Sequence, residues 1–382
     1  MASSLEQFIL DSQALVGRDA GDVSQGVAVA DWLSIRRFCA ALGDINPLYK
    51  DPSSGVATKY HSMIAPPTFI AAVRTPTSGA AYNQKQYALS LPNLTRFSAR
   101  WVDVMRVGDR LASDLKVVSA SEGPRSNGKP AAQVASQATY RNSYGGLIAQ
   151  ATGVTTLTPF AAGQEMLLDR PIYRYSAEEI TRIERGIDSE VPPRGKRPRY
   201  WNEVSEGEKL PGLVKGPVTL NDQMAWTVAE GKPVKMGALV YADLKAMPGR
   251  VRTNPTTSWP FWDADQEYDD ILSSKDMGLN GPPTRPMHRA CLAAQVVTDW
   301  MSNDGFLRSL DVELPSYFIY GDTLWLTGEV TDKYKERIGA ATYYAVDVRL
   351  RGVNQLGETI VRGTAAVYLP NPGSPVEIPI PA

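Results

Sequence analysis

The sequence is poor in the residues that bind metals and form disulfides. Its 382 residues include two histidines, His61 and His288, and two cysteines, Cys39 and Cys291. Neither cysteine has a His, Asp or Glu at metal-ligand spacing, so we expect no bound metal. Two cysteines provide no disulfide framework, which favours a reducing compartment. The scarcity of histidine also limits the choice of a proton shuttle near neutral pH.

Net charge and long apolar runs are lacking as well. Forty Lys and Arg residues stand against 41 Asp and Glu residues, for a net charge of −1. This balance provides no attraction to nucleic acid or to an anionic membrane surface, so neither is expected as a partner. The start "MASSLEQFIL" has no basic region, and no apolar run approaches the ~20 residues of a membrane-spanning helix. We therefore expect a cytoplasmic protein.

What the sequence does contain is a repeated pattern. Three segments recur in the same order: "APPTF" (65–69) as "GPPTR" (281–285), "RVGDRLASDLKVVSA" (106–120) as "IYGDTLWLTGEVTDK" (319–333), and "YRNSYGGLIAQATGVTTLTP" (140–159) as "RGVNQLGETIVRGTAAVYLP" (351–370). The offsets between the partners are all about 211 to 216 positions. Three pairs in register indicate a duplicated unit of fewer than about 200 residues.

Each copy has the same expected layout of a helical stretch, a Pro-Pro turn and then long strands. In "DWLSIRRFCAALGD" the apolar residues fall on one helical face, and Asp31 is positioned as the N-cap. Alternation in "YYAVDVRLRGV" is typical of an antiparallel sheet with one buried face. We expect an amino-terminal domain over 1–165, a helical and Pro/Arg-rich linker over 166–199, and a carboxy-terminal domain over 200–382.

Together, "GDINPLYKD", "IAPPTF", "VGDRL" and the late "NQLGET…GTAAVYLP" resemble the MaoC-like acyl dehydratases and enoyl-CoA hydratases with a double hotdog fold. The resemblance, closest to the FAS1-like dehydratase type at the amino terminus, covers nearly the whole chain. It implies an α+β tandem hotdog fold, in which two antiparallel sheets each wrap around a central helix. It also implies addition of water to, or its removal from, a carbon–carbon double bond conjugated to a thioester.

This chemistry needs a base for the water, an acid for the α-carbon and donors for the enolate oxygen, with no obligatory metal or organic cofactor. The resemblance implies that Asp44 handles protons and that Asn46 supports the geometry. Tyr49 stands where the family has a histidine. A phenol with a pKa near ~10 can donate a proton but is a poor base at pH 7. His61, shortly before the Pro-Pro turn, is a further candidate.

The Pro-Pro turn departs from the family pattern too. Catalytic units of the family tend to carry a His-Gly pair there, whose glycine amide faces the thioester oxygen. Pro66 and Pro67 have no N–H to donate. These departures are typical of the acyl-binding unit of two-domain members, and we assign Pro67, Thr68 and Phe69 to substrate binding.

The second copy does not contain the missing signature either. Lys232 stands in the place of the aspartate, and no histidine follows nearby. Candidates for a pocket completed by this copy are Asp263, in an aromatic and acidic stretch that is either a packed loop or a lid, together with Arg285 and His288. For each of these residues a purely structural role is the alternative.

The expected function is thus a hydro-lyase that acts on an enoyl thioester or on the matching 3-hydroxyacyl thioester. The substrate would be an acyl-CoA or an acyl-carrier thioester, and the acyl group is not encoded in any recognisable motif. A non-catalytic acyl-binding subunit and a hotdog thioesterase are the alternatives. A homodimer and a hetero-oligomer with a related subunit both remain open.

Overall fold

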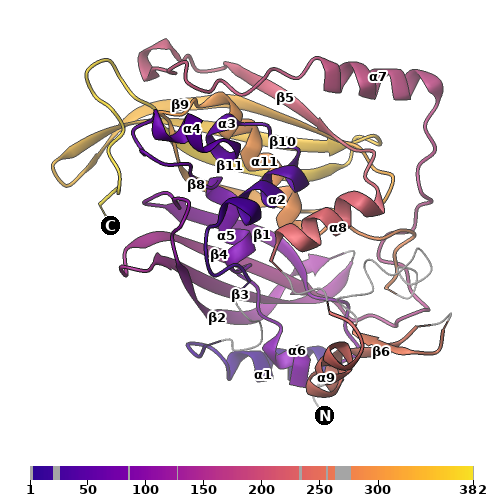
Figure 1. The fold of residues 1–382 in the computed structure, drawn as a ribbon. Helices are drawn as coiled ribbons and strands as arrows, with labels where there is room; N and C mark the ends of the chain where they lie inside the picture. Colours follow the sequence, from indigo (N-terminus) through magenta and orange to yellow (C-terminus); the bar gives the residue numbers. More distant parts are fainter. Residues whose placement is uncertain are drawn as a thin grey trace.

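A single antiparallel sheet of nine strands organises the molecule (Figure 1). The computed structural model describes residues 3–19, 26–84, 87–126, 128–231, 235–254, 257–262 and 277–381. The strand order is β2-β3-β4-β1-β8-β11-β10-β9-β5. The strands are β1 Asn93–Trp101, β2 Leu111–Ser126, β3 Lys129–Asn142, β4 Leu147–Leu157, β5 Lys209–Lys215, β8 Phe306–Glu313, β9 Leu324–Ile338, β10 Ala341–Asn354 and β11 Thr359–Tyr368.

The duplication predicted from the sequence is visible in this order. Read outward from the centre, β1-β4-β3-β2 on one side is matched by β8-β11-β10-β9 on the other. The two copies therefore meet edge to edge, where Ser98 of β1 pairs with Asp311 of β8. The expected two sheets are thus joined into one through these central strands, and β5 extends the second half.

Corresponding hairpins use the same turn chemistry. Between β3 and β4, the side-chain oxygen of Asn142 accepts hydrogen bonds from the backbone N–H groups of Tyr144 and Gly146. Between β10 and β11, Asn354 accepts from Leu356 and Glu358 in the same way. An Asn side chain that bonds its own turn two residues on fixes the bend, which explains why both copies retain it.

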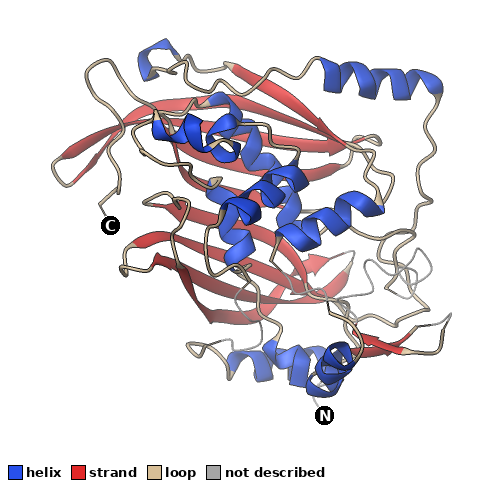
Figure 2. Cartoon of the chain, viewed as in Figure 1, coloured by secondary structure: helices blue, strands red, loops and turns tan. Residues whose placement is uncertain are grey.

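The helices lie mainly on one face of the sheet (Figure 2). They are α1 Ser4–Gln13, α2 Trp32–Leu42, α3 Pro47–Lys50, α4 Pro52–Val56, α5 Ile70–Val73, α6 Ala80–Gln84, α7 Ala177–Asp188, α8 Leu220–Ala229, α9 Ala238–Ala246 and α11 Pro286–Trp300, with short 3₁₀ turns η1 Pro67–Phe69, η2 Trp201–Glu203 and η3 Pro248–Arg250. A small second sheet pairs β6 Val251–Thr253 with β7 Pro260–Trp262. Among the described residues, no helix is both long and apolar enough to cross a membrane.

The two central helices differ greatly in length. In the second copy α11 has 15 residues, of which 13 are buried, as expected for a helix enclosed by a sheet. In the first copy the equivalent segment is only η1 followed by α5, which ends at Val73. Arg74 turns to extended backbone, and Pro76 two residues later cannot continue a helix. The first copy therefore has a truncated central helix.

Helix α7 is part of the segment that links the two copies and lies outside β5 (Figure 1). A capping box begins this helix, because Ser176 and Glu179 exchange side-chain-to-backbone hydrogen bonds. Asp31 likewise caps α2 by accepting from the N–H groups of Leu33 and Ser34. Gly43 ends α2 with a φ of 62°, a left-handed conformation that glycine adopts without strain. This termination delivers the chain directly to Asp44.

Candidate active site

The predicted motif at 43–49 folds into a tight turn that buries its carboxylate. Asp44 is only 2% exposed. Its Oδ1 accepts the backbone N–H of Asn46 at 2.8 Å, while the side-chain oxygen of Asn46 accepts the N–H of Leu48 at 3.1 Å and caps α3. Asn46 therefore shapes the turn that holds Asp44, which is the supporting role that we expected of it.

Burial raises the pKa of Asp44 to about 6, while its hydrogen bond from Asn46 and the nearby cation of Lys215 act in the opposite direction. Lys215 lies at the end of β5 and donates from Nζ to the carbonyl oxygen of Leu42 at 2.9 Å. A strand of the second copy thus brings its charge to the end of α2 in the first copy. Desolvation also lowers the pKa of this lysine.

A second carboxylate reaches the same region from α11. Burial, together with the negative charge of Asp44, raises the pKa of Asp299 to about 8. One oxygen of Asp299 accepts from Nε2 of Gln295 at 3.3 Å, and the other has no partner among the described residues. A carboxylate in the last turn of a helix also faces the negative end of the helix dipole. Asp44 and Asp299 therefore titrate as an interacting pair.

Tyr49 lies close to both carboxylates and also lines a pocket. Both charges, after desolvation, hold the pKa of its phenol well above the usual range. The side chain is almost fully buried, yet it lines the pocket together with Tyr60. Tyr49 thus stays protonated at neutral pH and is a hydrogen-bond donor in the wall of the pocket.

We call this cavity the Pro67 pocket. It has a volume of about 390 Å³, part of it open to solvent, and is lined by Leu48, Tyr49, Tyr60, Ile64, Ala65, Pro67, Trp101, Asp103, Val104, Met105, Met301, Ser302, Asn303, Gly305, Phe306 and Leu307. The indole N–H of Trp101 donates to the carbonyl oxygen of Pro67 at 2.9 Å and fixes the Pro-Pro turn in its wall. Both copies contribute, since residues 301–307 follow α11.

The neighbours of Pro67 have another role. Phe69 is fully buried and packs edge-on against Phe38, with ring centroids 5.3 Å apart. Thr68 is also buried, and neither side chain lines the Pro67 pocket. Both side chains therefore belong to the packed interior, and Phe69 packs there against α2. Of the three residues assigned to substrate binding in this turn, Pro67 is the one that reaches the pocket.

The two histidines occupy very different places. His61 is exposed in a turn with a positive φ of 51°, and the structure does not bring it to the buried carboxylates. His288 is buried on α11, stacks on Trp226 at 4.5 Å, and its Nε2 lies 3.0 Å from the carbonyl oxygen of Ala41. Desolvation lowers the pKa of His288 to about 4, so its ring is neutral at pH 7.

Two candidates from the second copy remain, Arg285 and Asp263. Arg285 lies 3.6 Å from a carboxylate oxygen of Glu230 and lines a different pocket. Asp263 lies outside the described residues. Sequence reasoning missed Lys215 and Asp299. The only signal for Asp299 was an acid within an otherwise apolar helix, and Lys215 gave none.

Comparison with known proteins matches the first copy to a dehydratase family model. Residues 14–151 match the family model of the FAS1-like dehydratase domain region. This region includes Asp44, Asn46 and Tyr49 and all the pocket residues that the first copy supplies. The resemblance to MaoC-like dehydratases that the sequence motifs predict is therefore confirmed.

Solved structures extend the similarity over both copies. A MaoC-like dehydratase aligns with a TM-score of 0.59 and 15% identity, covering 94% of this chain and 99% of that one. A putative MaoC domain protein dehydratase from Chloroflexus aurantiacus aligns at 0.57 and 13%, covering 93% and 98%. A conserved hypothetical protein of Mycobacterium tuberculosis, described with a double hotdog fold, aligns at 0.51 and 14%, covering 92% and 98%. The predicted double hotdog fold is confirmed.

Curated relatives cover less of the chain. A UPF0336 protein of Streptomyces avermitilis is 35% identical over 79 residues, which are 20% of this chain and 53% of that protein. A UPF0336 protein of Thermobifida fusca is 33% identical over 69 residues, 18% of this chain and 45% of that protein. The chain thus spans about half the length of these relatives.

Proposed function

We propose that the protein is a hydro-lyase that hydrates an enoyl thioester, or dehydrates the matching 3-hydroxyacyl thioester, at the Pro67 pocket. The observation that carries this proposal is the buried pair of carboxylates, Asp44 and Asp299, behind Tyr49 in the wall of an apolar pocket. A dehydratase-type region supplies Asp44, and the pocket suits an acyl chain.

The pKa values of the pair fit an acid and a base at the same pH. Near pH 7 a carboxyl with a pKa of about 6 is mostly ionised, and one with a pKa of about 8 is mostly protonated. Neighbouring groups whose environments separate their pKa values in this way are typical of acid–base catalysis. We assign Asp44 as the base and Asp299 as the proton reserve.

In the hydration direction, Asp44 takes a proton from water as its oxygen bonds to the β-carbon. Tyr49 gives a proton to the α-carbon, and Asp299 restores it. After release of the product, the proton on Asp44 passes to Asp299, and all atoms and protons are then accounted for. This assignment requires a water between Asp44 and the pocket. The sequence made His61 a further candidate beside Tyr49, and this assignment replaces His61 by Asp299.

Coenzyme A is the proposed carrier of the acyl group, and an acyl-carrier thioester is the alternative. The direct test is hydration of enoyl-CoAs of short, branched and aromatic acyl chains by the full chain. We expect loss of the ultraviolet absorbance of the enoyl thioester without release of free thiol. Asp44→Asn should abolish this loss while the variant remains folded by circular dichroism.

A non-catalytic acyl-binding subunit is the second candidate. Two observations favour it: Pro66 and Pro67 offer no backbone N–H to a thioester oxygen, and Asp44 itself does not line the pocket. Acyl-CoA binding without turnover of any substrate, and unchanged by Asp44→Asn, would support this function. Release of free CoA, detected with a thiol reagent, would instead indicate a thioesterase.

A further inference from the structure

The second copy has a pocket of its own, in the position that corresponds to the Pro67 pocket. We call it the Arg289 pocket. It has a volume of about 440 Å³, part of it open to solvent, and is lined by Leu91, Pro92, Asn93, Leu167, Met277, Leu279, Pro283, Thr284, Arg285, Pro286, Arg289 and Tyr317. Each pocket lies between the Pro-Pro turn of one copy and the start of the first strand of the other.

Because the two pockets correspond in position, their charged residues can be compared directly. The Pro67 pocket has one carboxylate, Asp103, and two phenols, Tyr49 and Tyr60, in its lining. The Arg289 pocket has two arginines in its lining. Arg285 is paired with Glu230. The charge that distinguishes this second pocket is therefore that of Arg289.

Arg289 is 1% exposed and among the largest fully buried side chains. Its Nη1 donates to the carbonyl oxygen of Ser316, and its Nε has no partner among the described residues. Desolvation lowers the pKa of this guanidinium to about 10. An arginine pairs with a carboxylate through two parallel N–H donors. With Nη1 occupied, the edge formed by Nε and Nη2 is the one left for such a pair.

Two further features of the same wall favour an anion. The hydroxyl of Thr284 is buried and has no hydrogen-bond partner among the described residues. Thr284 and Arg285 immediately precede the 15-residue helix α11, whose first N–H groups and positive dipole end attract negative charge. Buried polar groups without partners are rare in native proteins, so the Thr284 hydroxyl and Nε of Arg289 are both available to pair with a ligand.

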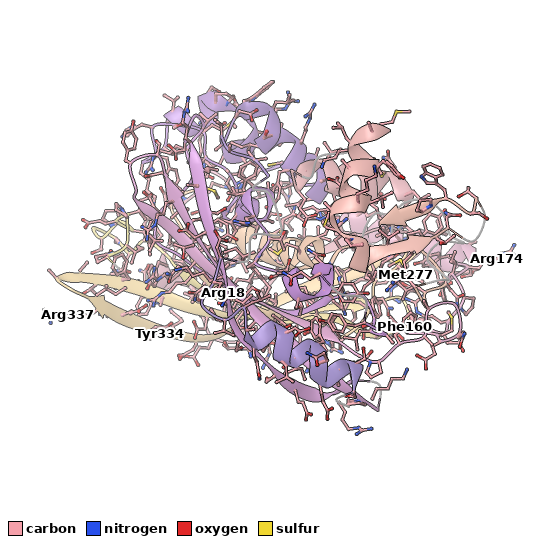
Figure 3. All side chains as sticks on the ribbon, turned by 90° about the horizontal axis from the view of Figure 1, so that it is seen from below. Arg18, Phe160, Arg174, Met277, Tyr334 and Arg337 are labelled. Atoms are coloured by element: carbon pink, nitrogen blue, oxygen red, sulfur yellow. The ribbon has the colours of Figure 1, made fainter. Side chains whose placement is uncertain are left out.

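Apart from Asn93 and Tyr317, the remaining walls are apolar, with leucine, methionine and proline side chains from both copies. Figure 3 places Met277 near Phe160, at the opposite end of the molecule from Arg337 in the β9–β10 hairpin. An inorganic anion would leave this apolar surface uncovered. A molecule with one planar anionic group and a short hydrocarbon chain would satisfy both parts of the pocket.

We propose that the Arg289 pocket binds a monocarboxylate with a short apolar chain, its carboxylate held by the Nε edge of Arg289 and by Thr284. Binding here is separate from turnover in the Pro67 pocket. A test of this site is therefore independent of the proposed hydro-lyase activity.

Calorimetric titration of the full chain tests the preference for charge. The probes are hexanoate, the neutral hexanamide of nearly the same shape, and inorganic phosphate. We expect hexanoate to bind and hexanamide to bind at least about tenfold more weakly, because hydrogen bonds between charged groups are the stronger kind. Phosphate should not compete. Equal binding of hexanoate and hexanamide, or displacement of hexanoate by phosphate, would overturn the proposal.

Variants locate the binding. Arg289→Met keeps an unbranched apolar stem and should remove the preference for hexanoate, whereas Arg362→Met, at an exposed pair with Glu313, should leave it unchanged. Leu91→Trp, in a part-buried loop at the pocket wall, should block hexanoate without touching the guanidinium. If Arg289→Met does not fold, Leu91→Trp alone tests whether hexanoate binds in the Arg289 pocket. Retention of the preference for hexanoate over hexanamide by folded Arg289→Met, or of hexanoate binding by Leu91→Trp, would place the ligand elsewhere.

Discussion

Nε2 of His288 lies 3.0 Å from the carbonyl oxygen of Ala41, a contact that joins α11 of the second copy to α2 of the first. Since a carbonyl oxygen only accepts, Nε2 carries the proton. Nδ1 has no partner among the described residues, so the ring has nothing to gain from a second proton. Burial lowers the pKa of His288 to about 4 for this reason.

This contact predicts a pH dependence of stability. The unfolded histidine has a pKa near ~6.5, so between this value and about 4 the unfolded chain binds a proton that the folded chain does not. The stabilisation is present above pH 6.5 and is lost as pH falls. Relative to His288→Gln, the free energy of unfolding of the natural protein should fall by about 2 kcal/mol from pH 7.5 to pH 5.

Urea unfolding of both proteins at the two pH values measures this difference. The glutamine keeps a donor toward Ala41 but does not titrate, so shared effects of other groups cancel. A constant difference between the two proteins at both pH values would show that His288 is charged or accessible in the folded state.

The sequence predicted the architecture because the relevant information was local and repeated. Asp31 and Ser176 cap the helices that their positions indicated. Asn142 and Asn354 mark equivalent hairpins. These features depend on the nearest few residues, and the hairpin signal occurs twice because of the internal repeat.

The site was only half predictable, because its parts come together through the packing of the two copies. The motif identified Asp44 and Tyr49, which share one turn. Lys215 and Asp299 reach them from β5 and α11 of the other copy, about 170 and 255 positions later in the sequence. The role proposed for His61 rested on closeness in sequence, and an exposed turn separates it from the carboxylates.

Phe38 provides a test of the packing that holds the motif. It is fully buried between Phe69, at 5.3 Å, and Trp226 of the second copy, at 5.5 Å. Phe38→Ala should lower the free energy of unfolding by roughly 3–5 kcal/mol, the usual cost of a large aromatic cavity. Leu33→Ala, on the same helix but 47% exposed, should cost less than about 1 kcal/mol. Equal costs would contradict the observed packing.

Tyr49 is the proposed donor to the α-carbon, and Tyr60 is its matched control in the same pocket. Tyr60 donates its hydroxyl to the carbonyl oxygen of Gly305 and has no assigned step. Tyr49→Phe should slow enoyl-CoA hydration by on the order of 10²-fold, the low end for a lost acid–base group. Tyr60→Phe should slow it much less. Similar rates for both variants would remove Tyr49 from the mechanism.

The interacting pair Asp44 and Asp299 predicts the shape of the pH–rate profile. Hydration requires an ionised base and a protonated acid, so the rate should rise through pH of about 6 and fall above about 8. Asp44→Asn should lower the rate at every pH by at least about 10²-fold. Asp299→Asn should remove the alkaline fall, because the group that loses its proton there is gone, while the acidic rise through Asp44 persists. Steady-state hydration of one enoyl-CoA from pH 5 to pH 9.5 measures all three profiles. An alkaline fall that survives in Asp299→Asn would assign that proton to another group and leave Asp299 as a structural neighbour of Asp44.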